Sequence, residues 1–165
     1  MTNNKTLIIV PMKDPYKSKS RLKGVFSIEI RKRLAVQLYS NTLRVLNLAI
    51  ENMQNNKISV MTKSEEISNI AVANKCIVIG EGEGDSLSNS LQCAAKWSVE
   101  KNFSRICIVP ADLADPHVDE IKKLLSYPIQ KIGAVICPSI DYGTNALFLS
   151  PPNKIKFKYG KKSFF

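Results

Sequence analysis

Short apolar runs recur along this chain and are separated by longer segments with helical periodicity. Apolar runs of this length are typical of strands that are buried on both faces of a sheet. They lie at 6–11, 58–61, 76–79, 106–110 and 134–137, and two further candidate strands lie at 146–149 and 155–157. The pattern predicts one sheet that is built largely from buried strands.

The intervening segments repeat apolar residues at intervals of three and four, which predicts amphipathic helices. The longest runs from Ser27 to about Met53, with Ser27 placed to cap it and Glu29 in its first turn. Its expected buried stripe comprises Ile30, Leu34, Leu38, Leu43, Val45, Leu46 and Ala49. Shorter helices are predicted at 64–73, 86–100 and 117–125. This alternation predicts an α/β fold, a single domain with a mostly parallel sheet and helices on both faces.

Loops beyond the carboxyl ends of the strands are the expected ligand-binding region of such a sheet, at the point where the strand order reverses. The rule selects the loop after the first strand, the glycine-rich loop 80–85, Asp112 and the turn 141–145. These segments are far apart in the sequence. We expect them to meet along one edge of the sheet.

Charge and composition narrow the function classes. The 165 residues carry a formal charge of +10, and the excess lies in the first 50 and the last 15 residues. Such ends attract nucleic acid, an anionic membrane surface or a small phosphorylated substrate, although an ordinary solvated lysine-rich surface is an alternative. No apolar run approaches the roughly 20 residues of a membrane-spanning helix, and the polar N-terminus lacks a signal-peptide core, so a cytoplasmic protein is expected.

The four cysteines give no sign of a metal site or a disulfide framework. Cys76, Cys93, Cys107 and Cys137 are widely separated and lie mostly in apolar segments. We interpret them as reduced, buried apolar side chains.

The loop VPMKDPYKSKSRL (10–22) is the strongest candidate for anion binding. It lacks the P-loop pattern, so a triphosphate held here would rely on side-chain cations, for which Lys13, Lys19 and Arg21 are candidates. A solvated basic loop explains the charge equally well.

Asp112 follows an apolar strand, where a carboxylate is costly unless it is solvated, paired or bound to metal. One carboxylate with substrate phosphates suffices for Mg²⁺, so Asp112 is the predicted metal ligand. Asp115 could share this role or cap the next helix.

Three other segments carry weaker signals that ordinary turn and cap chemistry also explains. Residues 85–89 (DSLSN) open a helix whose free N–H groups could receive a phosphate or the edge of a base. Segments 143–147 (GTNAL) and 159–163 (YGKKS) could bind an anion. His117, the only histidine, has no obvious nucleophile nearby and receives little functional weight.

Taken together, these segments resemble the 2-phospho-L-lactate guanylyltransferase family of coenzyme F-420 biosynthesis. The match covers nearly the whole chain and is carried by VPMK (10–13), KSRL (19–22), S-x-x-x-R-x-x-L (27–34), SLSNSL (86–91), VPADL (109–113), GTNAL (143–147) and YGKKSF (159–164). The resemblance implies a Rossmann-related three-layer sandwich like that of molybdopterin guanylyltransferases and nucleotide-diphospho-sugar transferases. It also implies transfer of GMP from GTP to 2-phospho-L-lactate, phosphoenolpyruvate or 3-phosphoglycerate, with release of pyrophosphate.

The resemblance also implies roles for individual residues. Lys13, Lys19 and Arg21 would engage the triphosphate as catalytic cations, Asp85 and Ser88 would bind the nucleotide, Asp112 would ligate Mg²⁺, and Thr144, Gly160 and Ser163 would hold the acceptor. An acceptor phosphate is already an anionic nucleophile, so no general base is required. Positioning and electrostatics supply most of the catalysis in such a transfer.

The sequence departs from the family at several positions. Alanine replaces a frequent proline at Ala114, and tyrosine replaces a frequent glycine at Tyr142. Family members continue to a histidine and an Asp-rich strand, whereas this sequence stops at Phe165. We therefore expect a truncated single nucleotidyltransferase domain over 1–165, with Asp141 or Asp115 as the alternative source of a second metal ligand.

Two other function classes stay open at this stage. One is a related nucleotidyltransferase with another nucleotide or acceptor. The other is a basic nucleic-acid-binding module, which the low aromatic content disfavours. The oligomeric state is also open, a homodimer included.

Overall fold

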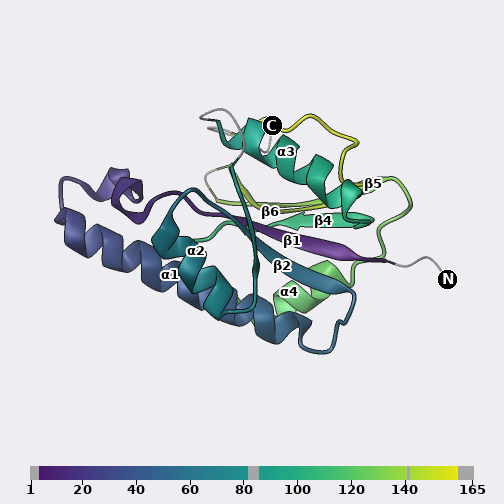
Figure 1. The fold of residues 1–165 in the computed structure, drawn as a ribbon, viewed down its shortest axis with the longest axis horizontal. Coiled ribbons are helices and arrows are strands. Elements are labelled where there is room, and N and C mark those ends of the chain that lie inside the picture. The colour runs from purple at the N-terminus through teal and green to yellow at the C-terminus, as the bar shows by residue number, and fades with distance from the viewer. Residues whose placement is uncertain (1–3, 82–85, 141, 160–165) are drawn as a thin grey trace.

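The computed structural model describes residues 4–81, 86–140 and 142–159, and these form one six-stranded sheet flanked by helices (Figure 1). The strands are β1 (Thr6–Pro11), β2 (Asn56–Met61), β3 (Ile77–Ile79), β4 (Arg105–Ile108), β5 (Gly133–Pro138) and β6 (Thr144–Ser150). The helices are α1 (Ile28–Ile50), α2 (Glu65–Ala73), α3 (Leu87–Glu100) and α4 (Val118–Leu125). The predicted α/β fold with a mostly parallel sheet and helices on both faces is confirmed.

The strand order, β3-β2-β1-β4-β6-β5, brings distant loops together. The chain builds the sheet outward from β1 to β3 and then returns to place β4 on the other side of β1. The order therefore reverses between β1 and β4, and their carboxyl ends open the crevice expected to hold a ligand. Because β6 runs antiparallel to β4, its first residue, Thr144, starts at this same edge.

Two apolar layers hold the sheet between its helices. Figure 1 shows α1, α2 and α4 on one face and α3 on the other. Ile8, Val10 and Phe148 face the first layer, whereas Leu7 and Ile9 face the second. This alternation along β1 explains why its apolar run is continuous, since both sides of a central strand are buried.

Helix α1 turns a different face inward from the one that its apolar pattern predicted. Its N-terminal half buries Arg31, Ala35 and Tyr39, whereas Ile30 is exposed. Tyr39 is fully buried and donates its hydroxyl to the Ile67 carbonyl on α2 at 3.2 Å, and this contact fixes the rotation of the helix. The predicted buried stripe is correct from Leu43 to the end of the helix. Before Leu43, the buried residues Arg31, Ala35 and Tyr39 each lie one position later in the sequence than the predicted ones.

The predicted strand 155–157 is wrong, because this segment is irregular. Phe157 is buried beside α3, and its amide donates to the Gln92 side chain at 3.3 Å instead of to a neighbouring strand. Pro151 and Pro152 precede the segment and remove two backbone donors.

Residues in the left-handed region end α2 and α3. Lys75 (φ 58°) follows α2 and Asn102 (φ 60°) follows α3. In each case the next amide bonds back to the helix, from Cys76 to the Ala71 carbonyl and from Phe103 to the Ser98 carbonyl. Both ends are Schellman motifs. Among the described helices, none combines the length and apolar character needed to cross a bilayer.

Candidate active site

A cleft of about 380 Å³ lies beyond the carboxyl ends of the parallel strands. Met12 and Met61 line it after β1 and at the end of β2, and Ala111 lines it after β4. Ser86 and Ser90, at the start of α3, form another wall. The cleft therefore occupies the position at which the strand order reverses, where this class of sheet binds its ligands.

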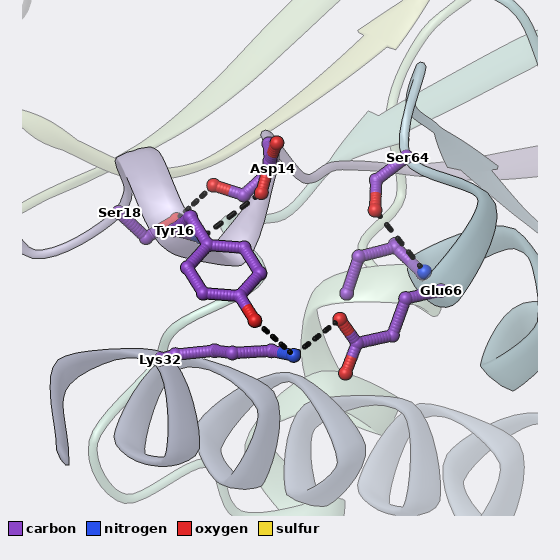
Figure 2. Close-up of polar contacts among 7 residues, drawn as sticks. Asp14, Tyr16, Ser18, Lys32, Ser64 and Glu66 are labelled. Atoms are coloured by element: carbon purple, nitrogen blue, oxygen red, sulfur yellow. Dashed lines mark hydrogen bonds and ion pairs between the residues drawn. The ribbon is translucent and has the colours of Figure 1, made fainter. Parts of the chain in front are cut away.

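The basic loop that borders this cleft is shaped by two short 3-10 helices, η1 (Pro15–Lys17) and η2 (Ser20–Leu22). Asp14 caps η1, with its carboxylate accepting from the Tyr16 amide at 2.9 Å. The Ser18 hydroxyl donates to the Asp14 carbonyl at 3.2 Å (Figure 2). The Asp14 carboxylate accepts from the loop's own backbone, and among the described residues it makes no ion pair with the lysines of the loop.

Lys19 connects the basic loop to the end of β4. Its ammonium group lies 2.5 Å from a carboxylate oxygen of Asp112. The backbone of Lys19 adopts φ 52°, a left-handed conformation that costs a non-glycine residue on the order of 1 kcal/mol. Strain of this kind is often retained where it serves a site.

An ion pair outside the cleft fastens the basic loop to two helices (Figure 2). Lys32 on α1 lies 4.4 Å from the ring centroid of Tyr16 in the loop and 3.3 Å from its hydroxyl. The same ammonium lies 2.9 Å from the Glu66 carboxylate in the first turn of α2, which Ser64 caps. Hydrogen bonds to Glu66 and then to Tyr16 raise the pKa of Lys32. This cation therefore stays charged while it holds the loop.

Four of the predicted site residues meet in the cleft. Lys13, Lys19, Asp112 and Thr144 all line it, although they come from three separate regions of the sequence. Arg21 is exposed on η2 and is not among the lining residues.

The structure gives the remaining predicted residues other settings. Ser88 does not line the cleft, because its hydroxyl accepts a hydrogen bond from the Tyr159 amide at 2.8 Å and ties α3 to the C-terminal segment. Asp85, Gly160 and Ser163 lie outside the described residues, as does Asp141. Their assigned roles stay predictions.

Sequence reasoning assigned no role to several polar residues that line the cleft, including Lys17, Glu81 and Tyr159. Lys17, interpreted from the sequence as a solvated neighbour, lines the cleft beside Lys19. Tyr159 also lines it, and burial raises the pKa of its phenol to about 12, so the hydroxyl stays a donor at neutral pH. The signal for Lys17 was present in the charge of its loop, but the direction of the side chain depends on η1.

A second cleft of about 520 Å³ lies on the other side of Asp112. Its polar lining includes Asp115, His117, Glu120 and Asn145. His117 and Asp115 are both exposed and lie 3.2 Å apart. The acidic character of this cleft makes it a poor site for a phosphorylated anion. The lysine-lined cleft is the better one.

The donor set around Asp112 fits Mg²⁺. In residues 4–81, 86–140 and 142–159, no three metal-ligating side chains converge. A hard cation that keeps several waters needs only one or two carboxylates together with substrate phosphates. Asp112 is half-exposed, and the cleft that it lines also contains the Glu81 carboxylate and three lysines that can bind those phosphates. It is therefore suited to hold a metal–nucleotide complex, rather than a metal enclosed by protein.

Sequence comparison relates this chain to known enzymes. Residues 6–165 match the family described as "Guanylyl transferase CofC like". The chain is 36% identical, over 94% of its length, to 3-phospho-D-glycerate guanylyltransferase of Colwellia psychrerythraea and covers 72% of that protein. It is 28% identical to phosphoenolpyruvate guanylyltransferase of Thermobaculum terrenum, covering 95% of this chain and 66% of the relative. Against 2-phospho-L-lactate guanylyltransferase of Methanocaldococcus vulcanius, identity is 29%, with coverage of 96% and 67%.

Solved structures share the fold. A protein from Desulfovibrio desulfuricans assigned to the nucleotide-diphospho-sugar transferases superposes with a TM-score of 0.70 at 15% identity, over 93% of this chain and 66% of its own. A cytidylyltransferase from Leptospira borgpetersenii gives 0.59 at 15% identity, over 88% and 60%. At these identities the likeness establishes the architecture and no more.

Proposed function

This chain belongs to the CofC-like guanylyltransferase family, and we propose that it transfers GMP from GTP to a phosphorylated three-carbon acid, as in coenzyme F-420 biosynthesis. The observation that carries the proposal is the convergence of Lys13, Lys17 and Lys19 opposite Asp112 at the point where the strand order reverses. Three cations that share a cleft with the carboxylates of Asp112 and Glu81 suit a nucleoside triphosphate and its metal.

The proposed reaction makes one bond and breaks one bond at the α-phosphorus of GTP. A phosphate oxygen of the acceptor attacks this phosphorus, and the bond to the bridging oxygen of the β-phosphate breaks. The electron pair leaves with pyrophosphate, and no proton has to be removed from the nucleophile. Orientation and charge stabilisation are therefore what the chain must supply.

The lysines of the cleft supply that charge stabilisation. Lys13, Lys17 and Lys19 would bind the triphosphate and lower the repulsion between two anionic substrates. Thr144, which lines the same cleft at the start of β6, would bind the acceptor as the family resemblance implies.

Asp112 would hold Mg²⁺, which when bound neutralises charge on the phosphates. Its carboxylate is shared in this structure with Lys19. The ammonium of Lys19 and a metal ion would therefore compete for the same Asp112 oxygen. With the metal bound to that oxygen, Lys19 would be free to bind the phosphates.

We propose 3-phospho-D-glycerate as the preferred acceptor. The relative named for this acid is 36% identical to the chain, compared with 28% and 29% for those named for phosphoenolpyruvate and 2-phospho-L-lactate. All three acids carry a phosphate and a carboxylate, so the lysine-lined cleft suits each of them. Discrimination among the three acids would depend on the residues around Thr144 that contact the acceptor.

The experiment is a pyrophosphate-release assay with the purified chain, Mg²⁺ and every pair of nucleotide and acid. We expect release with GTP and an acid, fastest with 3-phospho-D-glycerate, and a new diphosphate signal in the ³¹P NMR spectrum. ATP and CTP serve as matched controls for the base. Folded protein that releases no pyrophosphate with any pair contradicts the proposal.

Two alternatives give different results in the same assay. A related nucleotidyltransferase with another substrate would release pyrophosphate only with a different nucleotide or acceptor. A nucleic-acid-binding module would bind long polyanions with steep salt dependence and show no turnover. A cytoplasmic location and a homodimer stay predictions from the sequence.

A further inference from the structure

Arg31 is a buried cation at the base of the basic loop. It lies in the first turn of α1, and only 7% of its surface is exposed. Arginine is rarely buried without a partner, because removing a charge from water is costly. Its neighbour one helical turn later, Ala35, lines the lysine-rich cleft. The side chain therefore lies on the face of α1 that is turned toward the loop and the cleft.

The contacts of Arg31 do not balance its charge. One terminal nitrogen, Nη1, donates to the Ser18 carbonyl at 3.4 Å. The Nε atom is buried and has no hydrogen-bond partner among the described residues. Among the described residues, no carboxylate lies within ion-pair distance of the guanidinium, and Glu29, two positions earlier, attracts it only at longer range. A buried cation of this kind destabilises the fold, and its presence is explained if it orders a binding site or binds an anionic ligand.

The guanidinium of Arg31 donates to the carbonyl of Ser18, at the centre of the basic loop. Ser18 lies between Lys17 and Lys19, and both of these lysines line the cleft. Lys19 also adopts the left-handed conformation that aligns it with Asp112. A donor that fixes the Ser18 carbonyl therefore limits how the chain can turn between the two cations.

A second contact holds the loop to the same helix from the outside. Lys32, adjacent to Arg31, stacks on Tyr16 and pairs with Glu66 (Figure 2). The loop is thus fastened to α1 at Tyr16 by an accessible cation and at Ser18 by a buried one. The Lys32 contact reaches the loop only at Tyr16 in η1, whereas Arg31 contacts Ser18, the residue before Lys19. Arg31 is therefore placed to restrict the backbone conformation at Lys19.

We propose that Arg31 is a positioning residue for polyphosphate binding, which holds Lys17 and Lys19 toward the cleft through the Ser18 carbonyl. Its charge, which no ion pair among the described residues neutralises, adds to the positive potential of the cleft, and burial makes that contribution less screened than one from a surface lysine. The role rests on the proposed function only for the identity of the bound polyphosphate.

The first test measures the loop itself and needs no turnover. Hydrogen exchange is followed at the Leu22 amide, which donates to the Lys19 carbonyl at 3.0 Å, in the wild type, Arg31→Met, Arg31→Lys and Arg33→Met. Arg33 is an exposed residue of the same helix, so Arg33→Met removes an equal charge without touching the loop. We expect exchange to accelerate about tenfold in Arg31→Met and to stay unchanged in Arg33→Met.

The second test is a double-mutant cycle on equilibrium binding of GTP and of inorganic tripolyphosphate. Arg31→Met should weaken binding about tenfold when Lys19 is present and less than about threefold in a Lys19→Met background. Arg31→Lys should recover part of the loss. If Arg31→Met does not fold, Arg31→Lys takes its place in the cycle, with a smaller expected loss.

The outcomes separate this proposal from the proposed function. Unchanged loop exchange, or an equal loss of binding in both backgrounds, overturns the positioning role, because a general effect on stability would not depend on Lys19. Faster loop exchange together with a non-additive binding loss supports it. If this pattern occurs in a chain that releases no pyrophosphate with any acid, the transferase proposal fails and the role of Arg31 stands.

Discussion

Lys19 and Asp112 are 93 positions apart in sequence, and their charged groups lie 2.5 Å apart in the lining of the cleft. Their side chains remain 22% and 49% exposed, respectively. Ion pairs with this exposure contribute little to folding, typically about 0–1 kcal/mol. The ion pair therefore adds little to the stability of the fold, and its main consequence is to position an ammonium and a carboxylate group in the cleft.

This exposure separates activity from stability for Asp112. We expect Asp112→Asn to reduce turnover about 100-fold or more, because the amide is a weaker ligand for Mg²⁺ and releases Lys19. The free energy of unfolding should change by less than about 1 kcal/mol. Pyrophosphate release and urea unfolding measure the two effects.

Asp119→Asn is the matched control for Asp112→Asn. Asp119 is an exposed carboxylate in the first turn of α4 and does not line the cleft. Its replacement should leave turnover intact, with at most a few tenths of a kcal/mol lost at the helix N-terminus. Normal turnover in Asp112→Asn would remove this residue from the catalytic machinery.

The basic loop should show a hierarchy among its cations. Lys19 and Lys17 line the cleft, whereas Arg21 is exposed on η2. We expect KM for GTP to rise about tenfold or more in Lys19→Met, about threefold to tenfold in Lys17→Met, and less in Arg21→Met. Steady-state kinetics at fixed ionic strength gives the ranking, and Lys23→Met, on an exposed loop position, is the control. A larger effect at Arg21 than at Lys17 would contradict the assignment drawn from the cleft.

The location of this site could be predicted from the sequence, because it depends on the order and direction of the strands. Alternating apolar runs predict a mostly parallel sheet, and the ends of its strands must share an edge. That argument brings Lys13, Lys19, Asp112 and Thr144 together before any coordinates are known, and all four line the cleft. Ligand binding at strand ends is a property of the fold, so it does not depend on side-chain detail.

The remaining features depend on tertiary contacts that no local pattern contains. Apolar spacing favoured Ile30 as a buried position, yet packing of Tyr39 against α2 turns Arg31 inward instead. Similarly, Ser88 appears available in the sequence, but the Tyr159 amide, 71 positions away, uses its hydroxyl. Both cases are decided by long-range neighbours, which outweigh local preference in a packed interior.

The left-handed residue after α2 offers a gain in stability. Lys75 is exposed and adopts φ 58°, where a side chain is strained and glycine is not. We expect Lys75→Gly to raise the free energy of unfolding by about 0.5–1 kcal/mol. Urea unfolding with an unchanged m-value would establish the gain.

Two other substitutions serve as controls for Lys75→Gly. Lys75→Ala keeps the strain and should give no gain. Asn102→Gly, at the equivalent position after α3, should gain less, because asparagine tolerates this conformation better than lysine does. Equal gains from glycine and alanine at position 75 would show that the effect comes from the lost charge.

Buried thiols should make the fold sensitive to alkali. Burial raises the pKa of Cys76 to about 11 and also raises that of Cys107. The unfolded chain releases these protons near pH 9, so above that pH it binds fewer protons than the folded chain does. The contribution to stability is therefore complete below about pH 9 and is lost as the pH rises toward 11.

We expect the free energy of unfolding to fall between pH 9 and pH 11, and urea unfolding at half-unit intervals measures the slope. Cys76→Ala should flatten it by up to about 1.4 kcal/mol per pH unit, because one group that titrates only after unfolding is removed. Cys93 is exposed, so the prediction that all four thiols are buried is wrong for this residue, and Cys93→Ala should keep the wild-type slope. An identical slope in all three proteins would mean that Cys76 is solvated in the folded chain and that α2 and β3 pack less closely around it than the structure shows.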